Sequence, residues 1–155
     1  MTRRHVRRTR AELLDRLPRA FRPKLVPDQV RDLALAHVVN LDAIATGQAG
    51  EDILWQQLGG TFTWSRVAEL LGMGAPEMAE QVRLMEQVVQ RFRATGRVLF
   101  TGPEYQLAKH GLQVMDLLAA LVDRPTAIAA ASWGENRMNH MAVSGLTTKE
   151  QESKS

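Results

Sequence analysis

Apolar side chains recur at helical spacing in three long stretches of this chain, and this pattern sets the fold class. In residues 76–94 they follow spacings of 4, 3, 4 and 3, while the opposite side carries charged and amide side chains. A one-sided apolar stripe predicts an amphipathic helix that packs on a core. Residues 104–122 carry two adjoining apolar rows, which predicts burial against more than one neighbouring element.

The third stretch, residues 28–46, is apolar nearly all round between Leu33 and Leu41. Pro27 suits the first turn of a helix here, and Gly47 suits its end. A helix without a continuous polar face is typically buried on all sides. We therefore expect this helix to be the central one of the fold.

Glycine, proline and threonine divide the rest of the chain into shorter segments. The pair Gly59-Gly60 predicts a helix end, and Thr101 with Glu104 has the spacing of a capping box. The expected segments are a helix over 51–58, a strand over 61–63, a helix over 64–71, a strand over 97–100 and a helix over 126–132.

These elements predict an all-α fold, a compact bundle of five or six helices with at most a minimal two-stranded element near 61–63 and 97–100. The 155 residues have the length of one domain, and the absence of cysteine excludes a disulfide framework and thiolate metal sites. We expect a basic arm with a proline-punctuated linker over 1–26, a helical domain over 27–134 and a disordered polar tail over 135–155.

Positive charge is concentrated at the N-terminus. Residues 1–24 hold nine cationic and two acidic side chains, a net of +7, whereas the other 131 residues have a net of −4. Arginine binds phosphates and carboxylates through paired N–H donors. The segment therefore predicts an arm that contacts a polyanion or an acidic partner, or an arm that only keeps the protein soluble. The cations that would contact nucleic acid are Arg3, Arg4, Arg7, Arg8, Arg10, Arg16, Arg19, Arg22 and Lys24.

This basic segment does not fit an export signal. Only Leu13 and Leu14 come before Asp15, whereas a secretory or twin-arginine signal needs about 7–15 apolar residues after its charged start. An arginine-rich organellar presequence stays an alternative, against which Glu12 and Asp15 count. No stretch approaches the roughly 20 apolar residues of a membrane-spanning helix. We expect a cytoplasmic protein that does not bind a membrane.

Residues 63–78 resemble a helix-turn-helix unit. The small Ala68 stands where a second helix would cross the first, and Gly72 stands at the left-handed turn four residues later. With the two expected strands, the order of elements also looks like that of a winged helix. The second helix departs from this pattern because its first turn carries Glu77 and Glu80, which would repel DNA.

No arrangement of side chains predicts catalysis, a metal site or a cofactor. His37 lies on the apolar face of residues 28–46, where we expect a core histidine whose hydrogen bonds are satisfied, and His110 is expected at the core boundary. Neither histidine has a second ligand at metal-binding spacing. The glycine patterns of nucleotide loops and of the nucleophile elbow do not occur. We therefore expect a protein that is not an enzyme.

Two functions fit these observations. The leading hypothesis is a small helical protein, regulatory or accessory, that associates with DNA or RNA through the basic arm. The alternative is a protein-interaction module, an inhibitor or an adaptor, whose acidic helical core binds a partner protein. The partner contacts would be Glu77, Glu80 and Trp133, the last as an exposed anchor. Under the leading hypothesis, the helical core would form a homodimer or bind a partner.

Overall fold

The computed structural model describes the backbone of residues 23–152 and the side chains of residues 23–142. This part of the chain forms five α-helices and no strand, so the expected all-α bundle is confirmed. The predicted arm lies outside the described residues except for its last four. The helices are α2 (Pro27–Ala45), α3 (Glu51–Leu71), α4 (Ala75–Thr95), α5 (Gly102–Leu121) and α6 (Arg124–Glu152).

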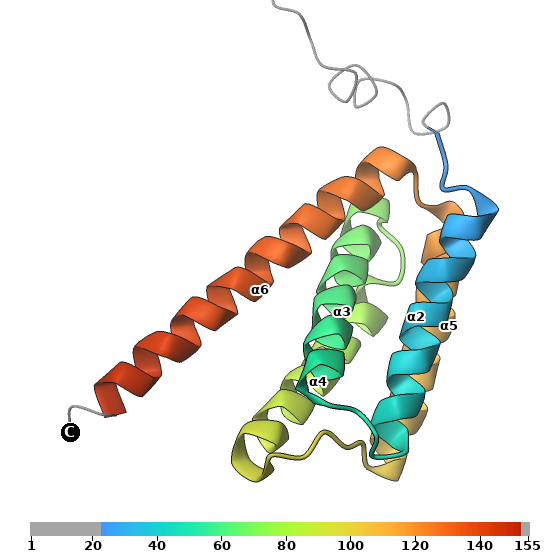
Figure 1. Cartoon of the computed structure of the whole chain (residues 1–155). Helices are drawn as coiled ribbons and strands as arrows, with labels where there is room; N and C mark the ends of the chain where they lie inside the picture. The colour runs from blue at the N-terminus through green and yellow to red at the C-terminus, as the bar shows by residue number, and fades with distance from the viewer. Residues whose placement is uncertain (1–22, 153–155) are drawn as a thin grey trace, which may run out of the picture.

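Helix α3 is the centre of the bundle, because it packs against each of the other four helices. Figure 1 shows α2 beside α5, α3 beside α4, and α6 running obliquely so that its C-terminal end points away from the bundle. The expected central position of α2 is wrong, since α2 lies at the edge and packs only on α3 and α5 within the described part of the chain.

The expected strand over 61–63 is wrong, because this segment lies inside the unbroken helix α3. The pair Gly59-Gly60 does not end a helix but lies at two helix contacts. A Cβ atom at Gly60 would overlap the ring of His37 on α2, and Gly59 packs on Met138 of α6. Gly60 lets α2 approach α3 closely, whereas a Cβ atom at Gly59 would make only an ordinary contact with Met138 (3.6 Å). The packing at these positions outweighs the low helix propensity of glycine.

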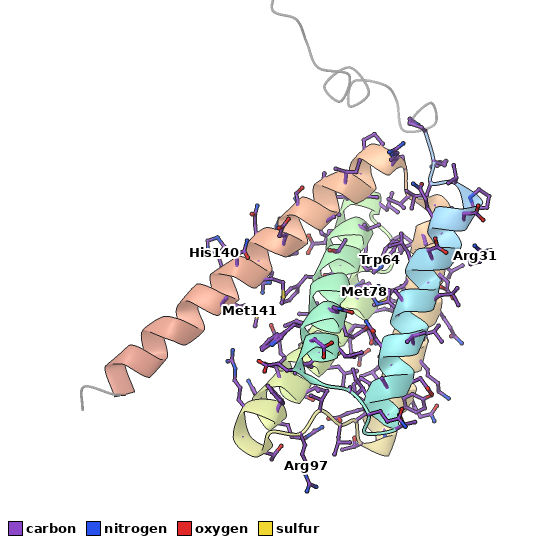
Figure 2. All side chains as sticks on the ribbon, in the orientation of Figure 1. Arg31, Trp64, Met78, Arg97, His140 and Met141 are labelled. Atoms are coloured by element: carbon purple, nitrogen blue, oxygen red, sulfur yellow. The ribbon has the colours of Figure 1, made fainter. Side chains whose placement is uncertain are left out.

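Helix α6 continues far beyond its expected end. The expected disordered tail over 135–155 is wrong for all but its last three residues, which lie outside the described part. Gly134 is buried against α3, and Met138 and Met141 pack on the core. Figure 2 shows Met141 on the side of α6 that faces the bundle. Extensive packing on α3 therefore holds a helix that shows no regular apolar stripe.

Local signals at the other helix ends are confirmed. At the start of α5, Thr101 Oγ1 accepts a hydrogen bond from the Glu104 N–H (3.4 Å), and Glu104 Oε2 accepts one from the Thr101 N–H (2.8 Å). Gly72 and Gly96 end α3 and α4 with φ angles of 67° and 71°, a left-handed conformation that glycine adopts without strain. The expected strand over 97–100 is wrong, because this segment pairs with no strand among the described residues.

Two polar contacts join α4 to α5. Arg91 donates from Nη1 and Nη2 to both carboxylate oxygens of Glu104 (2.9 and 2.6 Å), and these hydrogen bonds lower the pKa of Glu104. Gln81 is buried, and its Nε2 donates to the Leu107 carbonyl (2.9 Å). Gly111 leaves the space that the Gln81 side chain fills. The α4–α5 contact is therefore specific as well as apolar.

Candidate functional site

The root of the basic arm is fixed to the end of the bundle where α5 meets α6. The Pro23 carbonyl accepts a hydrogen bond from the Arg124 N–H (2.7 Å), and Lys24 Nζ donates to the Leu121 carbonyl (2.7 Å). Lys24 also forms an isolated antiparallel bridge with Asp123. Of the nine cations expected to contact nucleic acid, Lys24 alone lies within the described residues, and its ammonium group is bonded to the C-terminal end of α5.

Asp123 makes this junction rigid. Its side chain is buried, Oδ1 accepts a hydrogen bond from the Thr126 N–H (2.9 Å), and Oδ2 accepts one from the Thr126 hydroxyl (2.8 Å). These bonds satisfy donors at the first turn of α6, as an N-terminal cap does. The arm therefore leaves the bundle from a fixed point, immediately before α2 begins.

The predicted helix-turn-helix segment has its expected turn, but the strands expected around it are absent from the described residues. Ala68 is buried, and the turn at Gly72–Gly74 joins α3 to α4. The winged-helix order is wrong, since neither expected strand forms within the described part. Gln81, at a position where this unit needs an apolar residue, is buried and bonded to α5.

The two glutamates at the start of α4 lie in different environments. Glu80 is exposed, whereas Glu77 is half-buried, and its Oε2 has no hydrogen-bond partner among the described residues. A carboxylate in the first turn of a helix is favoured by the helix dipole. The negative charge therefore stabilises the start of the helix, but it would repel the negatively charged phosphate backbone of DNA.

A hydrogen-bonded network joins α2 to α3. The indole N–H of Trp64 donates to His37 Nε2 (3.0 Å), and His37 Nδ1 lies 3.0 Å from Gln57 Oε1. Because an indole only donates, Nε2 is the acceptor, so the neutral ring carries its proton on Nδ1 and donates it to Gln57. Burial lowers the pKa of His37, and the hydrogen bond to Gln57 partly opposes this. The expected satisfied core histidine is confirmed.

A groove of about 460 Å³ opens beside this network, between α2 and α6 and above α3. Leu33 of α2 and Ile128 of α6 line it and are exposed. Figure 2 shows Trp64 extending from α3 toward α2. Since α2 and α6 do not contact each other in the described part of the chain, the groove stays open between them. The lining residues from α3 are Gly60, Thr63, Trp64 and Val67.

Trp133 is not an exposed anchor, so that expectation is wrong. The side chain is half-buried and packs on the core between α3 and α6. Arg66 of α3 lies 5.6 Å from its ring centroid and Arg137 of α6 lies 5.7 Å from it. The Arg66 contact joins α3 to α6, and so does Arg137, which also lies 4.9 Å from the ring centroid of Phe62 on α3.

Among the described residues, no three histidine, aspartate or glutamate side chains come together as metal ligands. No described helix is long and apolar enough to cross a membrane. The pair Gln57 and Trp64 was missed by sequence reasoning, although a spacing of seven residues places both on one helix face. Comparison with protein-family models, with curated proteins and with solved structures finds no match for this chain.

Proposed function

We propose that this is a small non-enzymatic protein that associates with nucleic acid through its arginine-rich arm. The observation that carries the proposal is the separation of charge. Residues 1–24 have a net charge of +7, whereas residues 23–142 hold ten cationic and thirteen acidic side chains, a net of −3. A phosphate backbone would therefore be attracted to the arm and repelled by the body.

The way in which the arm is attached supports this proposal. Pro23 and Lys24 are bonded to the junction of α5 and α6, so the arm starts from a rigid point. The first two turns of α4 carry Glu77 and Glu80, and this helix is not the element that would contact DNA. Contacts made by the arm alone position a protein on the backbone without reading bases. We expect binding that depends little on sequence.

A filter-binding assay on short DNA duplexes over a series of salt concentrations tests the proposal. We expect Arg3→Gln, Arg4→Gln and Arg7→Gln together to weaken binding. The slope of log K against log salt should fall in magnitude by up to about 2.7, from about 0.9 for each lost phosphate contact. The matched control removes three charges from exposed arginines of the body, Arg83→Gln, Arg93→Gln and Arg97→Gln.

The control variant should keep the wild-type slope of log K against log salt, because its arginines lie on the acidic body and are not expected to contact phosphate. Figure 2 shows Arg97 extending away from the bundle beyond the end of α4. Equal losses in the two variants would contradict the arm as the binding element. Wild-type protein that does not bind DNA or RNA at low salt would end the proposal.

The groove favours a second function, a protein-interaction module. An open apolar groove between two helices is the shape that receives the apolar face of a partner helix. Leu33→Glu and Ile128→Glu would each place a charge on a rim of the groove, and Leu117→Glu is the matched control on an exposed position of α5. A partner that uses the groove is lost from both rim variants and retained by the control.

The acidic start of α4 provides a separate test of this second function. If a basic partner contacts α4 instead of the groove, Glu77→Ala and Glu80→Ala weaken the complex and the rim variants do not. A partner that is retained by all four variants uses neither surface. The two candidate functions are separable, because treatment with nuclease abolishes only an association that nucleic acid mediates.

A further inference from the structure

The outer side of α2 is an apolar surface that the bundle does not cover. Leu35, Val38 and Val39 are 52%, 47% and 60% exposed, whereas His37 and Ile44 on the opposite side are buried. Figure 1 shows α2 at the edge of the bundle with α5 behind it. Three exposed apolar residues within one and a half turns form an apolar patch, and contact of this patch with water is unfavourable in free energy.

Charged residues flank this patch in a symmetric order. Arg31 lies four residues before Leu35, and Asp42 lies four residues after Val38, so the spacings from Arg31 to Asp42 are 4, 3 and 4. Residues at such spacings form one line along a helix. The line reads cationic, apolar, apolar and acidic, and both charged ends are exposed. Figure 2 shows Arg31 on the outer side of α2.

This order is complementary to itself when reversed. If two α2 helices pack antiparallel about a point between residues 36 and 37, Leu35 of each copy lies opposite Val38 of the other. Arg31 of each copy then lies opposite Asp42 of the other, so one apolar centre is flanked by two ion pairs. A two-fold symmetric interface requires a surface of this self-complementary kind.

We propose that the outer side of α2 binds a second copy of this chain, with the two α2 helices antiparallel. The present partners of Arg31 do not compete strongly with this pairing. Its guanidinium nitrogens lie 3.7 Å from Asp28 and from Asp32, and its side chain is 66% exposed. Such long, solvated ion pairs contribute little and exchange readily. The small apolar area gives a weak dimer that depends on protein concentration.

The dimer would place the two basic arms at opposite ends of the helix pair. With a rise of 1.5 Å per residue, the N-terminal ends of the two α2 helices lie about 30 Å apart along the pair. This separation is close to one turn of B-DNA, about 34 Å. The consequence for binding rests on the proposed nucleic-acid function, whereas the dimer itself does not.

Sedimentation of the full-length protein without nucleic acid, over a wide range of concentrations, tests the dimer. Arg31→Glu and Asp42→Arg each place two like-charged pairs in the interface, so each variant alone should associate at least about tenfold more weakly. An equal mixture of the two variants should recover the dimer, because opposite charges then face each other twice. Arg93→Glu, at an exposed position of α4, is the control and should associate as wild type does.

Recovery in the mixture is the decisive result, because a variant that merely folds poorly cannot be rescued by another. The combined variant Arg31→Glu with Asp42→Arg should also associate with itself. A wild-type protein that stays monomeric, single variants that associate as wild type does, or a mixture without recovery would each overturn the proposal. A dimer that forms while nucleic acid does not bind would reject only the proposed function.

Discussion

Helices α2 and α4 pack on the same two neighbours, α3 and α5, and differ in what they turn outward. The apolar stripe of α4 faces inward, with Met78, Met85 and Val89 buried, while its outer side is charged and polar. Helix α2 buries one apolar side and exposes another. A one-sided apolar stripe therefore locates the core of a monomer. A helix that is apolar on all sides does not show whether its second apolar side is covered within the monomer or by another molecule.

The largest loss of stability should come from substitutions on the inward side of α4. Replacing Val89 by aspartate buries an unpaired charge in the core, and we expect a loss of about 3 to 5 kcal/mol of unfolding free energy. Leu118→Asp on α5 should cost a similar amount, since Leu118 is equally buried. Urea unfolding followed by circular dichroism measures both. Variants as stable as the wild-type protein would show that these faces are not buried.

The contact between α2 and α3 should be nearly as sensitive to an added methyl group. Gly60→Ala would force the ring of His37 to move, and overpacking of this kind costs about 1 to 3 kcal/mol. Gly102→Ala is the matched control, because a Cβ atom there meets nothing within 4 Å. Equal melting temperatures for the two variants would contradict the close approach of α2 to α3.

Local sequence patterns predict the ends of α2, α4 and α5 well but do not predict the role of the glycines at helix contacts. The bounds of α2, α4 and α5 follow from local periodicity and caps, and the expected ranges fall within two residues of the observed helices. Gly59-Gly60 and Gly134 have the composition of helix ends, but each lies where two helices approach closely. Only the positions of distant segments decide between these two roles, and local spacing does not contain them.

The same glycines explain why the hydrogen-bond partners of His37 were not predicted from the sequence. Burial of His37 follows from the apolar residues around it on α2. Its partners Gln57 and Trp64 lie on either side of Gly59-Gly60, so a helix divided at those glycines separates them. Once α3 is continuous, their spacing of seven residues places both beside His37. The arm, in contrast, was identified by charge alone, which needs no tertiary information.

The histidine on the inner side of α2 should make stability depend on pH. Burial lowers the pKa of His37, so below pH 6.5 the unfolded chain takes up a proton before the folded protein does. Stability is therefore complete above pH 6.5 and falls as the pH decreases toward the pKa of the folded state. The slope should reach at most about 1.4 kcal/mol per pH unit.

Thermal melts between about pH 5 and 7 measure this dependence, with His37→Asn as the control. Asparagine keeps a polar side chain at this position and does not titrate, so the melting temperature of this variant should vary less over this range. Equal slopes for the two proteins would show that His37 titrates alike in the folded and unfolded chains.

The ion pairs of the two helices should differ as their surroundings do. Arg91 of α4 forms a short two-point pair with a mostly buried Glu104, and Arg91→Gln should cost about 1 kcal/mol. Arg31 of α2 forms long, exposed pairs, and Arg31→Gln should change the stability of the monomer by less than about 0.5 kcal/mol. Urea unfolding at low protein concentration measures both, and equal effects would contradict the difference.

The smallest effect should come from the centre of the outer side of α2. Val38 is about half exposed in the monomer, so Val38→Asp buries no charge and exposes no core. Valine and aspartate have similar helix propensities, and Asp42 one turn later adds only a weak repulsion. We expect a change within about 0.5 kcal/mol at low protein concentration, against the loss of several kcal/mol for Val89→Asp.

The dependence of stability on protein concentration shows whether the outer side of α2 is covered within the monomer or by a second copy of the chain. The melting temperature of the wild-type protein should rise with concentration, because association stabilises the folded state by mass action. That of Val38→Asp should not rise, since the substitution places two carboxylates in the apolar centre of the dimer. If Val38→Asp destabilises the dilute protein as strongly as Val89→Asp does, the outer side of α2 is covered within the monomer, and the contrast between the two helices is wrong.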